Sequence, residues 1–516
     1  MFADSLFDEP QSYEEAMASE NSSEWLKAMQ IEYDSLINNG VWKLVDRPCN
    51  LNVVKSKWVF KVKHDTSGNF DRYKARLVAR GFSQKEGVDY SDPFLPVVRH
   101  STMRILFSLA TEYDMTIEHI DVTTAFLNGD LNETIYMEQP PGFMSEDNKV
   151  CVLLKSIYGL KQASRMWFLK VQELLTKNDY VQSKCEPCVY IKRCNRDLTI
   201  IALYVDDFYI FSTCNTKELF NLLDQNFDVK HLGLLTSCLG MRVTRRKDVL
   251  ILDQSEYIKR LLKRFCMSDC KIVSTPMCTN FKNVNSDTET LDDNVYQYRQ
   301  LVGCLMYLSV CTRPDITFSC SQLSQYLCNF NKNHWIAAKR VLRYLAGTIN
   351  FGLYFYKSDQ MNVKAYADSD WGNNFDRKSF TGFVIKLGRN VISWESRKQR
   401  CVALSSTEGE YLSISDVSKE LCFVKNFISE INDKHLSIEI FNDNQSAQKL
   451  LLAKEYSHKR TKHIDIRYHF VKDLVSKNIV TIRYLPTEYM TADVLNKPLG
   501  SLKHCNFVKD LNLLTV

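Results

Sequence analysis

Two adjacent carboxylates, Asp206 and Asp207, are the residues of this chain best suited to metal-dependent chemistry. Apolar runs at 200–205 and 208–211 flank the pair, which predicts two strands joined by a tight turn that carries both acids. Asp121 ends a further apolar stretch and supplies a third carboxylate. Carboxylate oxygens suit Mg²⁺, and two such ions can activate an attacking hydroxyl and stabilise a leaving pyrophosphate. The three acids predict a site for in-line nucleotidyl transfer, although a solvated turn would also carry such a pair.

Four more acids, Asp368, Glu410, Asp443 and Asp493, each end a strand or begin a helix in the pattern predicted for the last third of the chain. That pattern has strands at 363–368, 383–387, 391–394, 438–441 and 479–485 and a helix that begins near Glu410 and continues to 428. Each acid alone could be an ordinary cap. The order of elements is similar to the RNase H fold, in which four acids at such positions form a two-metal nuclease site.

Helices and a basic hairpin must position the first group of acids. Apolar periodicity predicts helices at 25–39, 101–113 and 162–178. Strands at 53–62 and 73–79 alternate around Gly68-Asn69, which favours a hairpin. Basic residues outnumber acidic ones along this hairpin, so it would attract phosphates, although an ordinary solvated basic face fits as well.

Composition limits the remaining choices. A chain of 516 residues with 45% hydrophobic residues is typical of a globular protein of several domains. Seventeen cysteines include a single Cys-x-x-Cys, at Cys185 and Cys188, and no second pair completes a zinc site. The longest apolar run, 301–311, is too short for a bilayer, and the N-terminus carries no secretory signal. We expect no membrane contact and a location in the cytoplasm or the nucleus, without secretion.

Three motifs occur in the order that one polymerase family shows: residues 121–129, residues 158–163 and the tetrad 204–207. Together with the segments 366–371 and 403–411, they resemble the reverse transcriptase and RNase H portion of copia-type (Pseudoviridae) retrotransposon Pol polyproteins. The resemblance covers nearly the whole chain. It implies an α+β and α/β multidomain protein, in which a right-hand polymerase with fingers, palm and thumb precedes an RNase H-like α/β domain.

The implied organisation has four segments. They are a polar N-terminal segment at 1–24, the reverse transcriptase fingers and palm at 25–278, a linker with a helical thumb or tether at 279–357, and the RNase H-like domain at 358–516. Within the third segment, residues 280–293 are polar and acidic without periodicity and are expected to be the linker.

The resemblance also implies which acids bind metal. Two Mg²⁺ per active site, or Mn²⁺ in their place, are expected on two sets of carboxylates: Asp121, Asp206 and Asp207 in the polymerase, and Asp368, Glu410, Asp443 and Asp493 in the RNase H domain. Glu408 competes with Glu410 for this role. We choose Glu410, because in the family the acid directly before the aromatic residue faces the site.

Four further residues would bind the nucleotide by the same resemblance. Lys74 and Arg76 would contact the β- and γ-phosphates, where the planar guanidinium suits phosphate oxygens. Phe126 would lie under the deoxyribose and favour dNTPs over rNTPs, and Gln162 would support the sugar and base. Lys74 and Arg76 could also be exposed strand cations, and Phe126 could be a core aromatic.

The expected function is an RNA-directed DNA polymerase with RNase H activity, which copies retrotransposon RNA into DNA and degrades RNA in RNA–DNA hybrids. Its partners would be an RNA template, a DNA primer, the hybrid and dNTPs, whereas nothing in the sequence indicates the oligomeric state. One alternative is a catalytically idle relic, truncated or captured by its host, that binds nucleic acid; the presence of all seven acids argues against it. A second alternative is an RNA-dependent RNA polymerase, against which the RNase H segment and Phe126 count.

Overall fold

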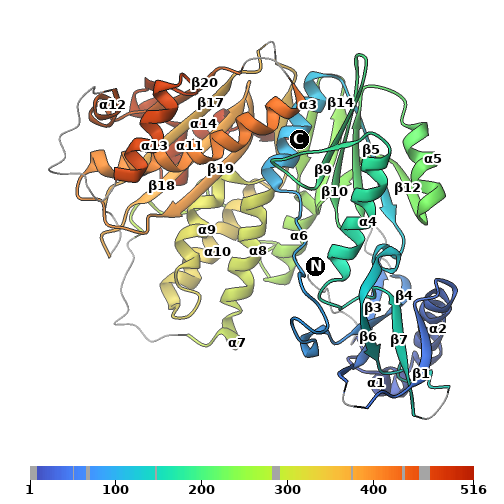
Figure 1. The fold of residues 1–516 in the computed structure, drawn as a ribbon. Coiled ribbons are helices and arrows are strands. Elements are labelled where there is room, and N and C mark those ends of the chain that lie inside the picture. Colours follow the sequence, from blue (N-terminus) through green and yellow to red (C-terminus); the bar gives the residue numbers. More distant parts are fainter. Residues whose placement is uncertain are drawn as a thin grey trace.

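The computed structural model describes residues 9–516 except for 50, 65–69, 146–147, 282–290, 359, 373–375, 433–435 and 453–464. The chain forms an N-terminal lobe, a central sheet with its helices, a helical segment and a C-terminal sheet with its helices (Figure 1). No helix among the described residues is both long and apolar enough to span a membrane.

The N-terminal lobe contains the predicted first helix and the basic hairpin. Its elements are α1 (Tyr13–Ala18), α2 (Ser22–Asn38), β1 (Trp42–Asp46), β2 (Val53–Val54), β3 (Ser56–His64), β4 (Phe70–Ala79), β6 (Asp130–Met137) and β7 (Lys149–Lys155). One sheet has the order β1-β7-β6-β2, and β3 pairs with β4 alone. The buried Trp25 of α2 packs edge-on against Phe60 and Tyr73 and so holds the helix on the hairpin. The expected turn at Gly68-Asn69 lies outside the described residues.

A six-stranded sheet of order β12-β5-β11-β10-β9-β8 forms the central part. Its strands and helices are α3 (His100–Glu112), β5 (Thr116–Val122), α4 (Ala163–Lys177), β8 (Val181–Gln182), β9 (Val189–Cys194), β10 (Asp197–Tyr204), β11 (Asp207–Ser212), α5 (Lys217–Asn226) and β12 (Val229–Leu234). The strands β10 and β11 are almost wholly buried, as continuous apolar runs predict. The predicted helices at 101–113 and 162–178 are present as α3 and α4 within one residue at each end.

A third sheet joins parts of the chain that are far apart in sequence. Its order is β13 (Ser237–Cys238), β14 (Met241–Arg246), β15 (Val249–Asp253), β16 (Phe351–Tyr356) and β22 (Leu513–Thr515). The helical segment comes from α6 (Ser255–Arg264), α7 (Asp293–Tyr296), α8 (Tyr298–Cys311), α9 (Thr317–Ser324) and α10 (Lys332–Gly347). Most of the expected linker at 280–293 lies outside the described residues. Because β22 pairs with β16, the end of the chain contributes a strand to a sheet that begins near residue 237.

The C-terminal sheet has the order β19-β18-β17-β20-β21. Its elements are β17 (Val363–Asp370), β18 (Phe380–Leu387), β19 (Asn390–Lys398), α11 (Ser406–Ile431), β20 (Ile438–Asn442), α12 (Gln445–Leu452), α13 (Asp465–Ser476), β21 (Thr481–Tyr484) and α14 (Ser501–Asp510). The first three strands are antiparallel, and β20 and β21 run parallel to β17. Asp493, expected at the start of a helix, lies instead in the short 3₁₀-helix η6 (Thr491–Leu495), because α14 begins only at Ser501.

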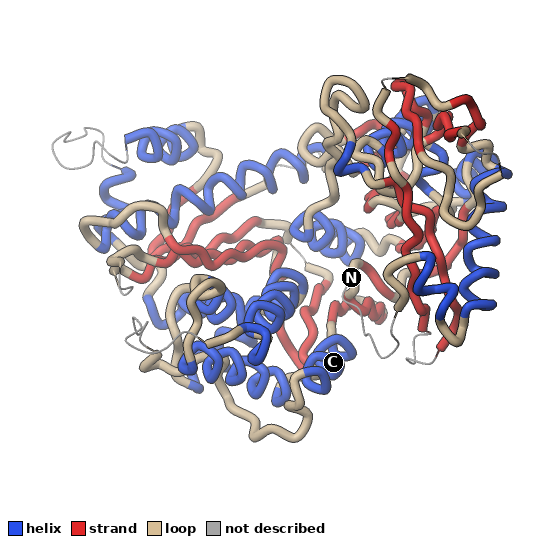
Figure 2. Tube along the Cα trace, turned by 90° about the horizontal axis from the view of Figure 1, so that it is seen from below, coloured by secondary structure: helices blue, strands red, loops and turns tan. Residues whose placement is uncertain are grey.

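The central part and the C-terminal part share one hydrophobic core, which contains buried residues of both sheets. Figure 2 shows the C-terminal sheet with helices on both of its sides. Arg104 of α3 crosses the boundary: its guanidinium donates to the carbonyls of Val310 and Ile392 at 2.8 Å and lies 3.9 Å from the ring of Trp394. These contacts fix α3 against β19, so the two parts form one body rather than two domains on a flexible tether.

Candidate active sites

The hairpin between β10 and β11 brings the first three acids to one edge of the central sheet. Tyr204 pairs with Asp207, so the turn consists of Val205 and Asp206. Asp207 is directly opposite Asp121 on the neighbouring strand β5. Directly opposed residues project to the same face of a sheet. The backbone N–H of Val122 also donates to the Asp206 carbonyl at 2.9 Å, which ties the turn to β5.

The turn is strained, and a buried tryptophan supports it. Val205 has a φ of +57°, a conformation that a β-branched residue rarely adopts and that costs about 1–3 kcal/mol. The indole N–H of Trp167, on α4, donates to the Val205 carbonyl at 2.6 Å. Trp167 is fully buried, so α4 sets the position of the turn that carries Asp206.

Electrostatic repulsion is already evident in this group. Burial, followed by the Asp207 and Asp121 carboxylates, raises the pKa of Asp206. His119 Nε2 lies 2.7 Å from Asp207 Oδ1, and the Tyr209 hydroxyl donates to Oδ2 at 3.4 Å. Neither His119 nor Tyr209 was predicted to lie at the site, although two-residue alternation from Asp121 and Asp207 would place them on the same face of the sheet.

Arg76 of the basic hairpin contacts a pair of aromatic rings, Tyr158 and Phe126. The Arg76 guanidinium lies 4.7 Å from the centre of the Tyr158 ring, and the Phe126 ring packs edge-on against Tyr158 at 4.9 Å. Burial, followed by repulsion from Arg76, lowers the pKa of Lys74 on the same strand. Tyr158, for which no role was predicted, thus links Arg76 to Phe126, and burial, followed by the Asp206 and Asp121 carboxylates, raises the pKa of its hydroxyl.

Gln162 lies in a different environment from the one expected. Its side chain is 2% exposed, accepts from Gln84 Nε2 at 3.0 Å and donates to the Asp89 carbonyl at 2.8 Å. Gln162 therefore holds the segment around 84–89 in this structure, and a contact with a nucleotide would require these bonds to be exchanged. That contact stays a prediction.

A cavity of about 610 Å³ opens beside the acids. Asp207, Leu239, Gly240 and the cations Arg260 and Arg264 of α6 line part of it. The Tyr307 hydroxyl of α8 donates to the Leu239 carbonyl at 2.8 Å and fixes the turn between β13 and β14. The helical segment and the acid-bearing hairpin therefore line the same cavity.

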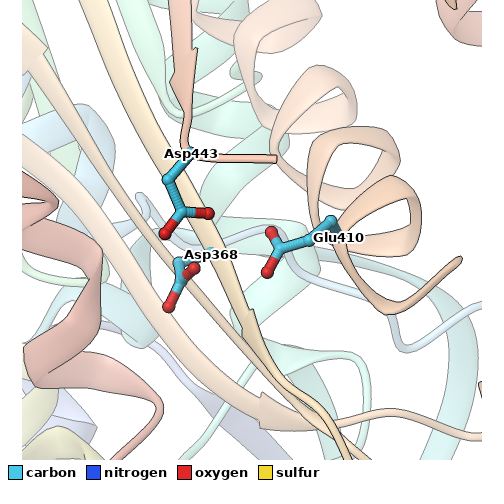
Figure 3. A group of neighbouring side chains, drawn as sticks. All are labelled: Asp368, Glu410 and Asp443. Atoms are coloured by element: carbon cyan, nitrogen blue, oxygen red, sulfur yellow. The ribbon is translucent and has the colours of Figure 1, made fainter. Parts of the chain in front are cut away.

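The C-terminal sheet forms a second group of acids. Asp368 on β17, Glu410 in the first turns of α11 and Asp443 directly after β20 each offer a carboxylate oxygen within 4.8 Å of the others (Figure 3). Burial, followed by the Asp368 and Asp443 carboxylates, raises the pKa of Glu410 well above its usual range. Three hard oxygen donors that repel one another fit a divalent cation, since such an ion would relieve the repulsion. Asp121, Asp206 and Asp207 do not form a group within this distance limit.

The geometry distinguishes Glu410 from Glu408. Glu410 accepts from the Ser369 N–H at 3.2 Å and from Asn442 Nδ2 at 2.8 Å, beside the other acids. Glu408 Oε2 accepts from the Leu404 N–H at 2.8 Å, at the start of α11. This contact directs Glu408 to the helix terminus, and the arrangement favours Glu410 as the metal ligand.

Asp493, the fourth expected acid, lies beside the group but is not within it. Burial, followed by the Asp368 carboxylate, raises the pKa of Asp493 to about 7. Its oxygens contact the ammonium groups of Lys497 at 2.6 Å and Lys503 at 2.5 Å. The sequence analysis missed both lysines, although Lys497 is four residues after Asp493, a spacing that often allows an ion pair.

Comparison with known proteins identifies the family. Residues 39–279 match the family described as reverse transcriptase (RNA-dependent DNA polymerase). Over 502 residues, 95% of this chain, the sequence is 41% identical to the retrovirus-related Pol polyprotein from transposon TNT 1-94 of Nicotiana tabacum, of which it covers 38%. The corresponding polyprotein from transposon RE2 of Arabidopsis thaliana is 37% identical over 98% of the chain, which covers 35% of it.

A shorter relative is matched from end to end. The putative transposon Ty5-1 protein of Saccharomyces cerevisiae is 30% identical over 311 residues, which are 58% of this chain and 100% of that protein. This chain spans little more than a third of the length of the two plant polyproteins. It belongs to the copia-type retrovirus-related Pol polyproteins and contains their reverse transcriptase domain.

Proposed function

We propose that this chain is an RNA-directed DNA polymerase whose active site is the hairpin tip at Asp206 and Asp207 together with Asp121. The observation that carries the proposal is the register of β11 on β5, which sets Asp207 opposite Asp121 in a chain of the reverse transcriptase family. Divalent ions on these carboxylates would activate the primer 3′-hydroxyl and neutralise charge on the leaving pyrophosphate.

The chain's own residues would orient the nucleotide. Arg76 and Lys74 lie on β4 beside the hairpin tip, where their charges would attract the triphosphate. Phe126 would pack against the deoxyribose, and contacts with the Tyr158 ring would hold Phe126 and Arg76 in position. In this proposal the N-terminal lobe acts as fingers, the central sheet as palm and the helical segment as thumb. The substrates would be an RNA template, a DNA primer and dNTPs.

We further propose that the C-terminal sheet is an RNase H-like nuclease that cleaves the RNA strand of an RNA–DNA hybrid. Three antiparallel strands followed by two parallel ones, with acids on β17, on α11 and after β20, support this proposal. The exposed Trp371 lies three residues beyond Asp368, and its indole N–H donates to the Ala403 carbonyl at 3.0 Å. An aromatic surface at this point would contact the sugar edge of the hybrid.

Primer extension tests the polymerase proposal. The full chain should extend a DNA primer on an RNA template with dNTPs and Mg²⁺, and Asp206→Asn should reduce extension by about 10²-fold or more, because it removes a carboxylate that would hold the divalent ions. The matched control is Asp224→Asn, which changes an exposed acid of α5. Template binding without extension by the unaltered chain would favour the idle relic and contradict the proposal.

Cleavage of a hybrid with labelled RNA tests the nuclease proposal. Glu410→Gln should abolish cleavage while extension continues, whereas Glu408→Gln should retain cleavage within about threefold if its carboxylate serves mainly the start of α11. Equal loss in both variants would contradict the assignment of Glu410.

A further inference from the structure

A lysine ammonium lies between the first and fourth acids of the C-terminal site. Lys497 Nζ is 2.6 Å from Asp493 Oδ1 and 3.2 Å from Asp368 Oδ2. Asn496 Nδ2 donates to the same Asp368 oxygen at 2.7 Å. Both acids are almost completely buried, so the ammonium neutralises charge that water does not reach.

The ammonium groups in direct contact with the acids lie on the Asp368 and Asp493 side of the site. Lys503 Nζ contacts the second oxygen of Asp493 at 2.5 Å, so each oxygen of that carboxylate has an ammonium partner. On the other side, Glu410 accepts hydrogen bonds from the Ser369 N–H and Asn442 Nδ2, and Asp443 accepts one from Thr487 Oγ1, all of them neutral donors. Lysines therefore contact both oxygens of Asp493 and one oxygen of Asp368, whereas the contacts of Glu410 and Asp443 come from neutral groups.

A divalent ion and an ammonium cannot contact the same two oxygens. Mg²⁺ requires oxygen ligands at about 2.0–2.1 Å, and its charge would repel an ammonium a few ångströms away. Lys497 must therefore leave before an ion can bridge Asp368 and Asp493. Its side chain is 31% exposed and has a flexible stem, so it can turn outward.

We propose that Lys497 takes the place of the second divalent ion in this site. The site binds one ion strongly, on Asp368, Glu410 and Asp443, and a second only by displacing the Lys497 ammonium from Asp368 and Asp493. This inference rests on the proposed nuclease function, because it concerns the same carboxylates.

Titration of the full chain with Mn²⁺, with free Mn²⁺ measured by electron paramagnetic resonance, tests the inference. Asp121→Asn and Asp206→Asn are present throughout to weaken ion binding at the polymerase site. This doubly substituted chain, the parent, should bind one Mn²⁺ ion with high affinity, and Asp443→Asn should abolish that binding. Lys497→Gln should bind a second ion at least tenfold more tightly than the parent binds its weaker ion. Lys503→Gln is the matched control: it contacts Asp493 but not Asp368, so it should change that affinity less than threefold.

Two equally strong, Asp443-dependent ions in the parent would overturn the inference, as would Lys497→Gln with an unchanged second affinity. Thermal unfolding would reveal whether Lys497→Gln folds. If it does not, the number of ions that the parent binds strongly still tests the inference. Hybrid cleavage by the unaltered chain is measured separately. Its absence would refute the proposed nuclease function, while the ion counts would still decide whether Lys497 excludes a second ion.

Discussion

The two acid groups differ in how the chain builds them. The acids of the proposed polymerase site come from one strained hairpin tip and a single neighbouring strand, and one of them, Asp207, contacts a histidine and a tyrosine. The C-terminal acids come from separate elements between residues 368 and 493, and two lysines already neutralise one of them. A site built locally depends on the geometry of its turn, whereas a site assembled from distant elements depends on its charge balance.

The largest expected effect comes from weakening the contacts between the central part and the C-terminal part, which carry the two sites. Arg104→Ala should remove its hydrogen bonds to the carbonyls of Ile392, Val310 and Cys311 and leave a cavity beside Trp394. Because buried acceptors without partners are costly, we expect the free energy of unfolding to fall by about 3 kcal/mol. Denaturant unfolding measures this. Arg196→Ala, an exposed change between β9 and β10, should cause little loss.

The next effect concerns the polymerase site alone. His119→Leu should free the Asp207 carboxylate and reduce kcat for extension by about 10–100-fold, the range for residues that orient metal ligands. KM for dNTP should change little, because His119 acts through its contact with the Asp207 carboxylate. Hybrid cleavage should be unaffected. Tyr209→Phe removes only the longer 3.4 Å contact and should have a smaller effect. A fall in cleavage equal to that in extension would contradict the separation of the sites.

The pH dependence of stability should reflect the C-terminal site more than the proposed polymerase site, where burial also raises the pKa of Asp206. Burial and neighbouring carboxylates raise the pKa of Glu410 and that of Asp493, the latter to about 7. The folded chain then binds more protons than the unfolded chain, so stability should fall as pH rises from about 4 to 7, by at least about 1 kcal/mol. Thermal unfolding in EDTA at pH 5 and 7.5 measures this fall. Mg²⁺ should reverse much of it, and Glu410→Gln should reduce it.

The smallest effect concerns the strained turn. Val205→Asn should raise the free energy of unfolding by about 1 kcal/mol, because asparagine tolerates a positive φ better than valine. Val205→Thr keeps a β-branched side chain and should give no gain. If both variants behave alike, strain at residue 205 does not contribute to stability.

The elements that carry most of the acids could be predicted because local patterns determine them. Alternation around Asp206 and Asp207 predicted the hairpin, and the spacing from 414 to 428 placed Glu410 on a helix. Tertiary contacts determine what was not predicted. Nothing local indicates that Gln162 is buried or that residues 513–515 pair with β16.

The position of Lys497 likewise depends on η6 lying against β17, which brings Asp368 and Asp493 to one ammonium. Asp493 itself shows the limit of a local pattern. Its place near the acids was expected, but the pattern suggested a regular helix where the chain forms a 3₁₀ turn.

The most direct test of two sites in one body is to map RNA cuts on a template whose primer is stalled by a missing dNTP. We predict cuts at one fixed spacing from the primer 3′ end. These cuts should remain when Asp206→Asn prevents extension, and they should be absent in Glu410→Gln, which should still extend the primer. Cuts scattered without regard to the primer end, or one substitution that removes both activities from a folded protein, would contradict this prediction.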